Sequence, residues 1–409
     1  MKILVLAGGY DQIALIQKIK KRGHYVILAD YYKNPPAKDV ADMHYQISTL
    51  DEDAVCRVAE DEQVDMIVTA CTDQALMTVA SVSDRLGLPT YLSKMTALNV
   101  TNKSNMKKLL NDCNVPTAFS YIFKRTEEIN YNLFEGTYPL VIKPCDCNSS
   151  KGVVKVQSFE KLKKAVQDAF ELSRSHQVIV EEFMEGIELS IDIWNGNDEI
   201  KILSVTETIK RKDSENDFTI CGSVYPAGIN QDDEKQIYDI AERIINGFEL
   251  PKGPVLIQAI KTKNGIKVIE FSARMGGGTK YELIELISGV DIMEVYTQLV
   301  LDNMVKSVEP KKTTKSIEMI YIYARDGVFC KLLGFEDCKK EKIIDDYFLY
   351  KTPGTEIKSA KTSSDRISGV IISATNQEEL LKKKQEFLHR ADIWDINKES
   401  MMIKESIGE

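Results

Sequence analysis

Three oxygen-bearing side chains fall on one face of a predicted β-hairpin in the second half of the chain. Val255–Ile260 and Ile266–Phe271 are rich in β-branched and apolar residues and read as its two strands. Gln258, Glu270 and Ser272 share a face when these strands pair in one particular register. An all-oxygen set suits a hard cation such as Mg²⁺ (or Mn²⁺), which takes one or two protein carboxylates and completes its shell with phosphate and water.

The loop between the two strands decides that register. A two-residue turn at Asn264-Gly265 would put Gln258 and Glu270 on opposite faces of the hairpin. A three-residue loop, with Gly265 in the left-handed conformation, sets Gln258 directly opposite Glu270. We therefore predict a three-residue loop that starts at Lys263.

A predicted anion site follows on the same strand. Arg274 continues the face of Ser272, and Gly276, Gly277 and Gly278 then lead into a predicted helix, Thr279–Leu286. The amides and the positive dipole end of a glycine-rich helix entry attract phosphate or carboxylate, and a guanidinium matches either anion. A plain glycine linker would not explain why a carboxylate, an arginine and these glycines stand so close together.

Two further segments carry groups that suit a nucleotide. Lys143 ends a predicted strand, and the polar loop from there to Gly152 can wrap its backbone amides around a polyphosphate, although such a loop alone is more often an ordinary surface hairpin. Glu188 alternates with Ser190 and Asp192 on a later strand. A carboxylate at the start of that strand, where the chain bends, suits a hydroxyl-bearing ligand.

The elements that must position these groups alternate along the chain. Short strands separated by helices fill the first ninety residues, which predicts a parallel sheet with right-handed crossovers. The strands expected there are Lys2–Ala7, Tyr25–Ala29, Met66–Ala70 and Pro89–Leu92. Gly8-Gly9 does not complete the G-x-G-x-x-G pattern, so it is more typical of a tight turn than of a dinucleotide site. A β–β–α–β unit is expected between Tyr138 and Glu182.

The composition is that of a globular protein of two to four packed units. The chain has 409 residues, 43% of them apolar and 28% charged. Its net charge of −9 argues against a nucleic-acid binder, and no apolar run approaches the ~18 residues of a membrane span. The eight cysteines form no CxxC pair and only four histidines occur. We therefore expect reduced thiols, a cytoplasmic location, and chemistry carried by Lys, Glu, Arg and backbone amides.

Taken in order, these features resemble the ATP-grasp superfamily over essentially the whole chain. The resemblance implies ATP and Mg²⁺ as cofactors, metal positions at Gln258, Glu270 and Ser272, and substrate contacts from Arg274 and Gly276–Gly278. Arg274 and Lys143 are the implied catalytic residues. The implied nucleotide-binding residues are Lys103, Lys143, Ser149, Ser150, Gly152, Glu181, Glu182, Phe183 and Glu188.

Two residues depart from the superfamily pattern, which usually has Glu where Gln258 stands and Asn where Ser272 stands. A neutral Gln removes one negative charge, so a second metal should be held less firmly. Glu270 and both lysines are present, which favours an active site.

The same resemblance implies an α/β and α+β fold in three parts. We expect a Rossmann-like domain at residues 1–100, an ATP-grasp domain at 101–310 with a mobile lid at about 116–182, and a small closing domain at 311–409. The stretch around Arg274 is similar to carboxylate–amine ligases of the amino-acid and peptide type. The phrase SSDRISGVII resembles the closing domain of biotin carboxylase and purine-pathway enzymes.

The implied activity is amide formation through an acyl phosphate, with release of ADP and phosphate. The expected partners are a small carboxylate and an amine, amino acids first, and the chain is expected to form a homodimer. Two alternatives stay open: a carboxylase or purine-pathway ligase, for which Lys210-Arg211-Lys212 is a candidate phosphate cluster, and a nucleotide-binding regulatory protein with a degenerate metal site. A dehydrogenase is a poorer fit.

Overall fold

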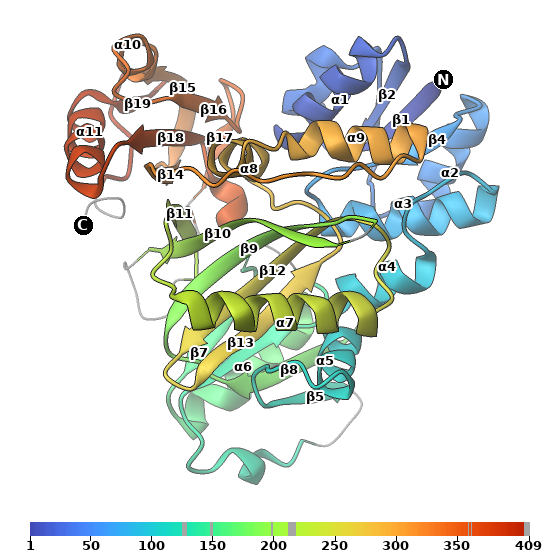
Figure 1. Cartoon of the computed structure of the whole chain (residues 1–409), viewed down its shortest axis with the longest axis vertical. Helices are drawn as coiled ribbons and strands as arrows, with labels where there is room; N and C mark the ends of the chain where they lie inside the picture. The colour runs from blue at the N-terminus through green and yellow to red at the C-terminus, as the bar shows by residue number, and fades with distance from the viewer. Residues whose placement is uncertain are drawn as a thin grey trace.

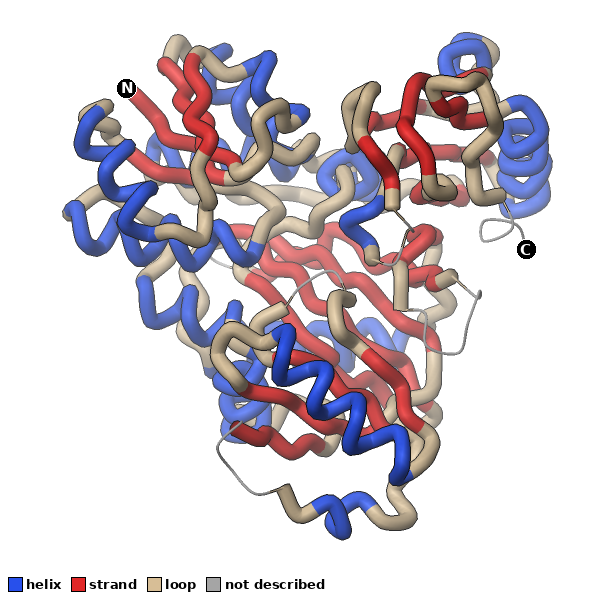
Figure 2. The backbone as a smooth tube through the Cα atoms, turned by 180° about the vertical axis from the view of Figure 1, so that it is seen from behind, coloured by secondary structure: helices blue, strands red, loops and turns tan. Residues whose placement is uncertain are grey.

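The computed structural model describes residues 1–124, 129–147, 150–197, 199–211, 218–358, 360 and 362–404, and every structural statement below concerns these residues. Their strands form four sheets with helices packed against them (Figure 1). The N-terminal and C-terminal units lie side by side at one end of the molecule, and a separate small sheet lies at the other (Figure 2). The mixed α/β and α+β fold expected from the sequence is confirmed.

The N-terminal unit is a parallel sheet with the strand order β3-β2-β1-β4. Its strands are β1 (Lys2–Leu6), β2 (Tyr25–Asp30), β3 (Met43–Gln46) and β4 (Met66–Val68). The helices of this unit are α1 (Asp11–Lys21), η1 (Pro36–Val40), α2 (Glu52–Asp61) and α3 (Asp73–Leu86). The inner strands are buried on both faces because helices cover each side of the sheet. This arrangement confirms the predicted Rossmann-like unit.

The strand predicted at Pro89–Leu92 is wrong. That segment is an irregular bend before α4 (Lys94–Thr101), and Tyr91 donates its hydroxyl proton to the carbonyl of Ala273, 2.7 Å away. The apolar side chains of such a short segment can bury themselves without any pairing partner for the backbone.

The small sheet has the order β5-β8-β6-β7 and corresponds to the unit expected between Tyr138 and Glu182, with one additional strand. Its elements are β5 (Ser120–Lys124), η2 (Tyr131–Phe134), β6 (Leu140–Pro144), β7 (Val154–Val156), α6 (Phe159–Leu172) and β8 (Gln177–Glu182). Helix α6 covers one face and buries Leu162, Val166 and Phe170 against it. This sheet shares no strand with the others.

The largest sheet has eight strands in the order β13-β12-β9-β10-β11-β14-β18-β16. The strands are β9 (Ile187–Asn195), β10 (Ile200–Lys210), β11 (Ile220–Tyr225), β12 (Gly253–Thr262), β13 (Gly265–Ser272), β14 (Ser316–Ile322), β16 (Asp346–Leu349) and β18 (Ser368–Ala374). Since β11 pairs with β14, one continuous ladder runs across the domain boundary expected at residue 310.

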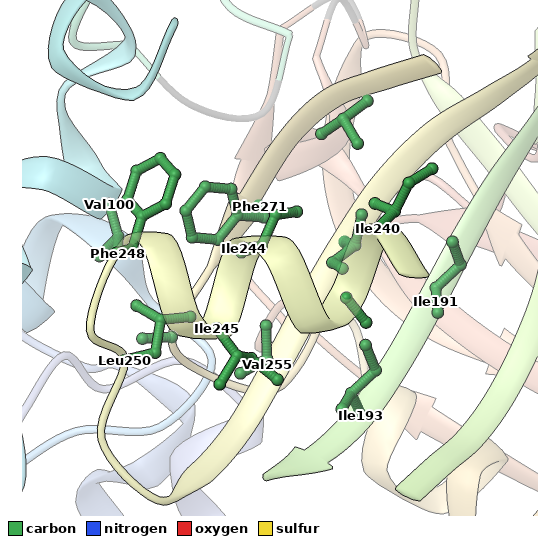
Figure 3. Packing of buried hydrophobic residues seen from close by; sticks show 14 of the residues in the cluster. Val100, Ile191, Ile193, Ile240, Ile244, Ile245, Phe248, Leu250, Val255 and Phe271 are labelled. Atoms are coloured by element: carbon green, nitrogen blue, oxygen red, sulfur yellow. The ribbon is translucent and has the colours of Figure 1, made fainter. Parts of the chain in front are cut away.

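One face of this sheet is apolar and carries the main core. Along β9, Leu189, Ile191 and Ile193 point to this face, where α7 (Gln231–Gly247) packs through Ile240 and Ile244 (Figure 3). At the end of α7, the rings of Phe248 and Phe271 meet edge to face with their centroids 4.5 Å apart. Helix α5 (Lys103–Asp112) borders the same core. The opposite face of β9 carries polar residues and is therefore left to the functional site.

The remaining elements connect and close the molecule. They are α8 (Lys280–Ser288), α9 (Ile292–Asp302), β15 (Gly327–Leu333), α10 (Phe335–Lys340), β17 (Glu356–Ile357), η3 (Ser363–Asp365), α11 (Gln377–Arg390) and β19 (Asp392–Asp395). Strands β17, β15 and β19 form the fourth sheet. None of the described helices is both long and apolar enough to cross a lipid bilayer.

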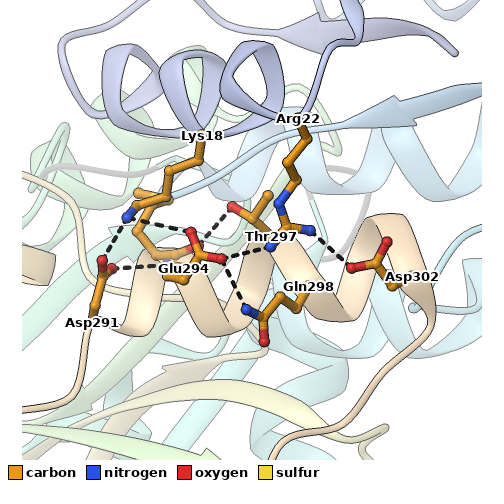
Figure 4. Close-up of polar contacts among 8 residues, drawn as sticks. Lys18, Arg22, Asp291, Glu294, Thr297, Gln298 and Asp302 are labelled. Atoms are coloured by element: carbon orange, nitrogen blue, oxygen red, sulfur yellow. Dashed lines mark hydrogen bonds and ion pairs between the residues drawn. The ribbon is translucent and has the colours of Figure 1, made fainter.

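Ion pairs join the N-terminal unit to α9. Lys18 lies 2.5 Å from Asp291, and Arg22 reaches Glu294 at 2.6 Å and Asp302 at 2.9 Å (Figure 4). Each pair is partly exposed and contributes about 1 kcal/mol or less. Together they fix the orientation of α1 on α9, and through α9 the position of the Rossmann-like unit relative to the large sheet.

Candidate active site

A single cavity of about 1120 Å³ opens over the polar face of the large sheet. Four polar side chains form one row across this face, because Glu270 pairs with Gln258, Gln258 with Ser190, and Ser190 with Thr206 on successive strands. The first three line the cavity, and Thr206 is fully buried at the end of the row. With strands about 4.8 Å apart, the row is roughly 14 Å long. The predicted juxtaposition of Gln258 and Glu270 is confirmed.

The predicted three-residue loop between the two strands of this hairpin is wrong. Only Lys263 and Asn264 separate the two strands, since Thr262 already pairs with Gly265. A β-bulge supplies the missing residue: the partner shifts from Val268 to Glu270 between two consecutive residues of β12. The bulge, and not the turn, therefore turns Glu270 toward the cavity.

At one end of the row, Lys103 contacts the candidate metal carboxylate. Its Nζ lies 3.0 Å from Glu270 Oε2 and donates to the Cys147 carbonyl at 2.9 Å. Burial alone would raise the pKa of Glu270, but the attraction of Lys103, and then of Lys143, lowers it below its ordinary value. Glu270 is therefore ionised at neutral pH and available to a cation.

The second predicted lysine, Lys143, is buried and forms an ion pair with Glu181. Lys107, which the sequence reasoning missed, approaches the same carboxylate at 3.1 Å. Lys107 stands four residues after Lys103 on α5, so helical spacing places both on one face of that helix, which was the available signal. Glu181 thus holds two cations, and none of the three side chains is among those that line the cavity, although Lys143 still lowers the pKa of Glu270.

The other predicted nucleotide residues have partners as well. Glu182 pairs with Lys267 at 2.7 Å, Glu188 forms an ion pair with Lys210, and Lys155 lies 3.8 Å from the centroid of the Phe183 ring. The backbone is engaged as well, since the amide of Glu182 donates to the Phe119 carbonyl at 3.0 Å and that of Phe183 to the Pro139 carbonyl at 3.1 Å. None of Glu182, Phe183 and Glu188 is among the residues that line the cavity, and the adenine and ribose assignments stay predictions.

The predicted phosphate loop is described only in part. Ser149 and its neighbour Asn148 lie outside the described residues. Ser150 lines the cavity in a left-handed conformation with φ 62°, and its hydroxyl donates to the Phe218 carbonyl at 3.0 Å. Gly152 has φ 75°, a conformation that favours glycine.

Near Glu270, on the continuation of β13, Arg274 is already paired. Its guanidinium donates two bonds to Asp73, the first residue of α3, and Asp73 also accepts a 2.5 Å bond from the hydroxyl of Ser272. Burial alone would raise the pKa of Asp73, but Arg274 holds it below its ordinary value. Asp73 lies about two hundred residues from its partners, so no local sequence pattern pointed to it.

The glycine-rich segment is held from the N-terminal unit. Asp11 accepts a bond from the amide of Gly278 at 3.0 Å and another from the amide of Thr279 at 2.7 Å. Gly276 and Gly277 line the cavity beside them. The amide of Gly278, predicted to bind substrate, is thus occupied by a carboxylate of the protein, which fixes the segment in place.

A different arginine has no acidic partner. Arg366 lines the cavity, stacks on Tyr321 with its guanidinium carbon 3.6 Å from the ring centroid, and donates through Nε to the Tyr323 hydroxyl at 3.3 Å. No carboxylate in the described part of the chain lies within 4.0 Å of it. A half-buried guanidinium without a carboxylate partner is a stronger candidate for an anionic substrate group than Arg274. Its place in SSDRISGVII was noted from the sequence, but no role was assigned to it.

The residues predicted for metal binding fit Mg²⁺ in chemistry. Gln258, Glu270 and Ser272 present oxygen donors to one cavity, and Ser272 keeps its acceptor lone pairs while it donates to Asp73. Among the described residues, no group of three or more His, Cys, Asp or Glu side chains is arranged to hold a metal ion. With a single carboxylate, the site requires phosphate oxygens and water to complete an octahedron.

The chain is similar to known ligases and carboxylases in sequence and fold. Residues 101–278 match the family described as phosphoribosylglycinamide synthetase, ATP-grasp (A) domain. A phosphoribosylamine–glycine ligase from Caldanaerobacter subterraneus is 26% identical, with 91% of this chain and 92% of that protein covered.

Two solved structures show the same fold. An L-amino acid ligase from Bacillus licheniformis superposes with a TM-score of 0.77 at 20% identity, covering 96% of this chain and 98% of that one. The biotin carboxylase domain of a 2-oxoglutarate carboxylase from Hydrogenobacter thermophilus gives 0.78 at 15% identity, covering 98% and 91%. The names of these three proteins refer to different substrates, while the two solved structures share the overall fold of this chain.

Proposed function

Because the chain belongs to the ATP-grasp superfamily, whose relatives here are ADP-forming, C–N bond-forming ligases, we propose that it is an ATP-dependent carboxylate–amine ligase. A carboxylate is a poor electrophile, since its charge repels a nucleophile and oxide leaves badly. Transfer of the γ-phosphoryl group converts it to an acyl phosphate, which an amine attacks with release of phosphate. The protein contributes positioning and charge neutralisation.

The nucleotide end of the cavity supplies the positive charge for this chemistry. We assign Lys103 and Lys143 to the phosphates of ATP. Lys103 lines the cavity and pairs with Glu270, while Lys143 is buried behind the lining and pairs with Glu181. Glu270, with Gln258 and Ser272, would hold Mg²⁺. The bound Mg²⁺ supplies charge neutralisation of the phosphate oxygens.

The observation that carries the proposal is the shape and lining of one cavity. At about 1120 Å³ it exceeds the ~300–1,000 Å³ typical of a pocket for one small ligand, which supports room for ATP together with a second molecule. Lysines and a metal-type carboxylate line one end, and Arg366 lines the other. Phosphoryl transfer between two anions needs this distribution of charge.

The basic end of the cavity also supports a second candidate, a ligase for a phosphorylated amine. Lys351 and Lys358 line the cavity with Arg366, and Lys358 is largely exposed and pairs with Glu356 at 3.1 Å. Lys351 and Arg366 are therefore the cations that support binding of a phosphate. The cluster suggested by the sequence is less suitable, since Lys210 pairs with Glu188, Arg211 donates to the Ala360 carbonyl, and Lys212 lies outside the described residues. The relatives that join phosphoribosylamine to glycine make this substrate the first phosphorylated one to test.

An ADP-release screen with Mg²⁺ tests the proposal and separates the candidates. The twenty common amino acids are supplied singly and in pairs, and phosphoribosylamine is supplied with glycine. Turnover with one amino-acid pair names the substrates of the first candidate; turnover only with phosphoribosylamine identifies the second. Binding of ATP without turnover in any mixture would favour the regulatory alternative that Gln258 and Ser272 suggest.

Glu270→Ala should abolish ADP release, because it removes the single carboxylate of the metal site. Glu318→Ala is the matched control: Glu318 is also buried and also pairs with a lysine, Lys384 at 2.9 Å, but it does not line the cavity. Full activity of Glu270→Ala would refute the metal assignment. The homodimer and the cytoplasmic location stay predictions.

A further inference from the structure

Lys280, the first residue of α8, places a buried amine on the floor of the cavity. Its side chain is 7% exposed and lines the cavity. The Nζ atom donates to the hydroxyl of Thr206 at 2.6 Å, at the end of the polar row opposite Lys103. An ammonium can donate three hydrogen bonds, so one described acceptor leaves this group capable of further contacts.

A carboxylate with an unused oxygen lies beside it. Asp192 Oδ2 is 4.0 Å from Lys280 Nζ and accepts a bond from the Ser204 hydroxyl at 2.7 Å. Asp192 Oδ1 is buried and has no hydrogen-bond partner among the described residues. A Cβ built on Gly276 would lie 3.6 Å from that oxygen and 3.0 Å from Lys280 Cγ. The glycine-rich segment therefore rests directly on these two side chains.

The surroundings of Lys280 lower the pKa of its amine. Burial lowers the pKa of Lys280 and Arg366 lowers it further, while Asp192 raises it. Burial likewise raises the pKa of Asp192, against the attraction of Lys280 and Arg274. Burial thus disfavours the charged form of each group, so the pair is suited to exchanging a proton with a bound molecule.

We propose that Lys280 accepts a proton from the attacking amine, with Asp192 as its positioning residue. This inference rests on the proposed ligase function and assigns it the base that the sequence did not reveal. A substrate ammonium loses two protons when it becomes an amide nitrogen. One leaves with the departing phosphate, which is released as hydrogen phosphate. Lys280 takes the other before the amine attacks the acyl carbon and then passes it to water.

The competing role for Lys280 is to hold an anionic substrate group by charge alone. Arginine separates the two roles, because its guanidinium keeps the positive charge but does not deprotonate in proteins. If Lys280 only holds an anion, Lys280→Arg retains turnover. If it accepts a proton, Lys280→Arg fails in the same way as Lys280→Met.

Hydroxylamine tests the step in isolation, since it is largely uncharged at neutral pH and attacks an acyl phosphate without help from a base. Two reactions are compared in the full-length protein with ATP, Mg²⁺ and the twenty amino acids. The first is ADP release with the amino acids as the only amines, and the second is hydroxamate formation after hydroxylamine is added. Lys384→Arg, at a buried lysine outside the cavity lining, is the matched control.

Both Lys280 variants should lose at least about 100-fold in the amine reaction but retain hydroxamate formation within a few-fold, which also shows that they fold. Lys384→Arg should retain both reactions. Turnover of Lys280→Arg with amino acids at the unaltered rate would overturn the assignment, as would equal loss of both reactions in both variants. No hydroxamate from the unaltered protein would instead overturn the proposed function, and the role of Lys280 with it.

The pH profile tests Asp192. A base acts when deprotonated, so kcat/KM rises with pH through the pKa of Lys280. Asp192 raises that pKa, and Asp192→Asn should therefore move the rising limb to lower pH. A limb that stays in place would remove Asp192 from the proposal.

Discussion

Replacing Gly278 by alanine should damage catalysis far more than stability, and the chain contains a control for the backbone effect. Gly278 and Gly289 have nearly the same left-handed backbone, with φ 73° and 72°. A Cβ at Gly289 would meet nothing within 4 Å, whereas a Cβ at Gly278 would lie 2.5 Å from Nη1 of Arg366 and 3.0 Å from the hydroxyl of Tyr321. The two substitutions therefore share the strain and differ in the displaced neighbours.

The magnitudes follow from this geometry. A non-glycine residue in the left-handed region costs roughly 1–2 kcal/mol, so both variants should lose about that much stability. Restoring an ordinary contact distance at Gly278 requires the guanidinium of Arg366 to move by about 1 Å, and a misplacement of this size can cost about 100-fold in rate. We expect Gly278→Ala to lose about 100-fold in kcat/KM and Gly289→Ala to stay within about two-fold of the unaltered protein.

Urea unfolding and steady-state ADP release measure the two effects separately. The substrates are those identified by the screen, and KM and kcat are resolved for each variant. Full activity of Gly278→Ala would show that Arg366 need not hold its position. An equal loss of activity in Gly289→Ala would show that strain on α8, and not displacement of Arg366, is responsible.

Two further predictions concern stability. Phe248→Ala should lower the free energy of unfolding by about 3–5 kcal/mol, since it opens a void beside Phe271, while Phe248→Leu costs distinctly less; equal urea midpoints would contradict the packing. Lys103→Met should lower the free energy of unfolding most above pH ~4.3, where Glu270 is ionised in both the folded and the unfolded chain. The loss should become smaller as the pH falls through the lowered pKa of Glu270 in the folded protein. A difference in urea midpoint that grows toward acid would refute the Lys103–Glu270 pair.

The sequence correctly predicted on which face of its strand a site residue lies. Alternation along β9 and β13 placed Asp192, Glu270 and Ser272 on the correct face, because a strand has a period of two. The position of Gln258 opposite Glu270 was also correct, although the turn was not, because a bulge can compensate for a loop of different length. Periodicity identifies a face without revealing how the chain turns.

Periodicity could not predict contacts between segments that lie far apart in the sequence. Asp11, Asp73 and Arg366 enter the cavity from helices or loops that pack over the sheet only in the folded chain. Each is an ordinary charged residue in its local sequence, where a solvated surface is the usual interpretation. Strands β5 and β11 were missed for a related reason: they are short, and only pairing with remote strands stabilises them.

The continuous ladder from β9 to β18 has a consequence for the order of events in a catalytic cycle. Arg366 stands two residues before β18, so backbone hydrogen bonds through β14, β11 and β10 tie it to the floor that carries Asp192. The small sheet of β5–β8 is attached to this ladder through the isolated bridge between Thr117 and Val268. The half of the cavity that carries Arg366 and Lys280 is therefore preformed, and little conformational entropy is lost when a ligand enters it. Binding in this rigid half of the cavity then precedes any movement of the small sheet over the nucleotide.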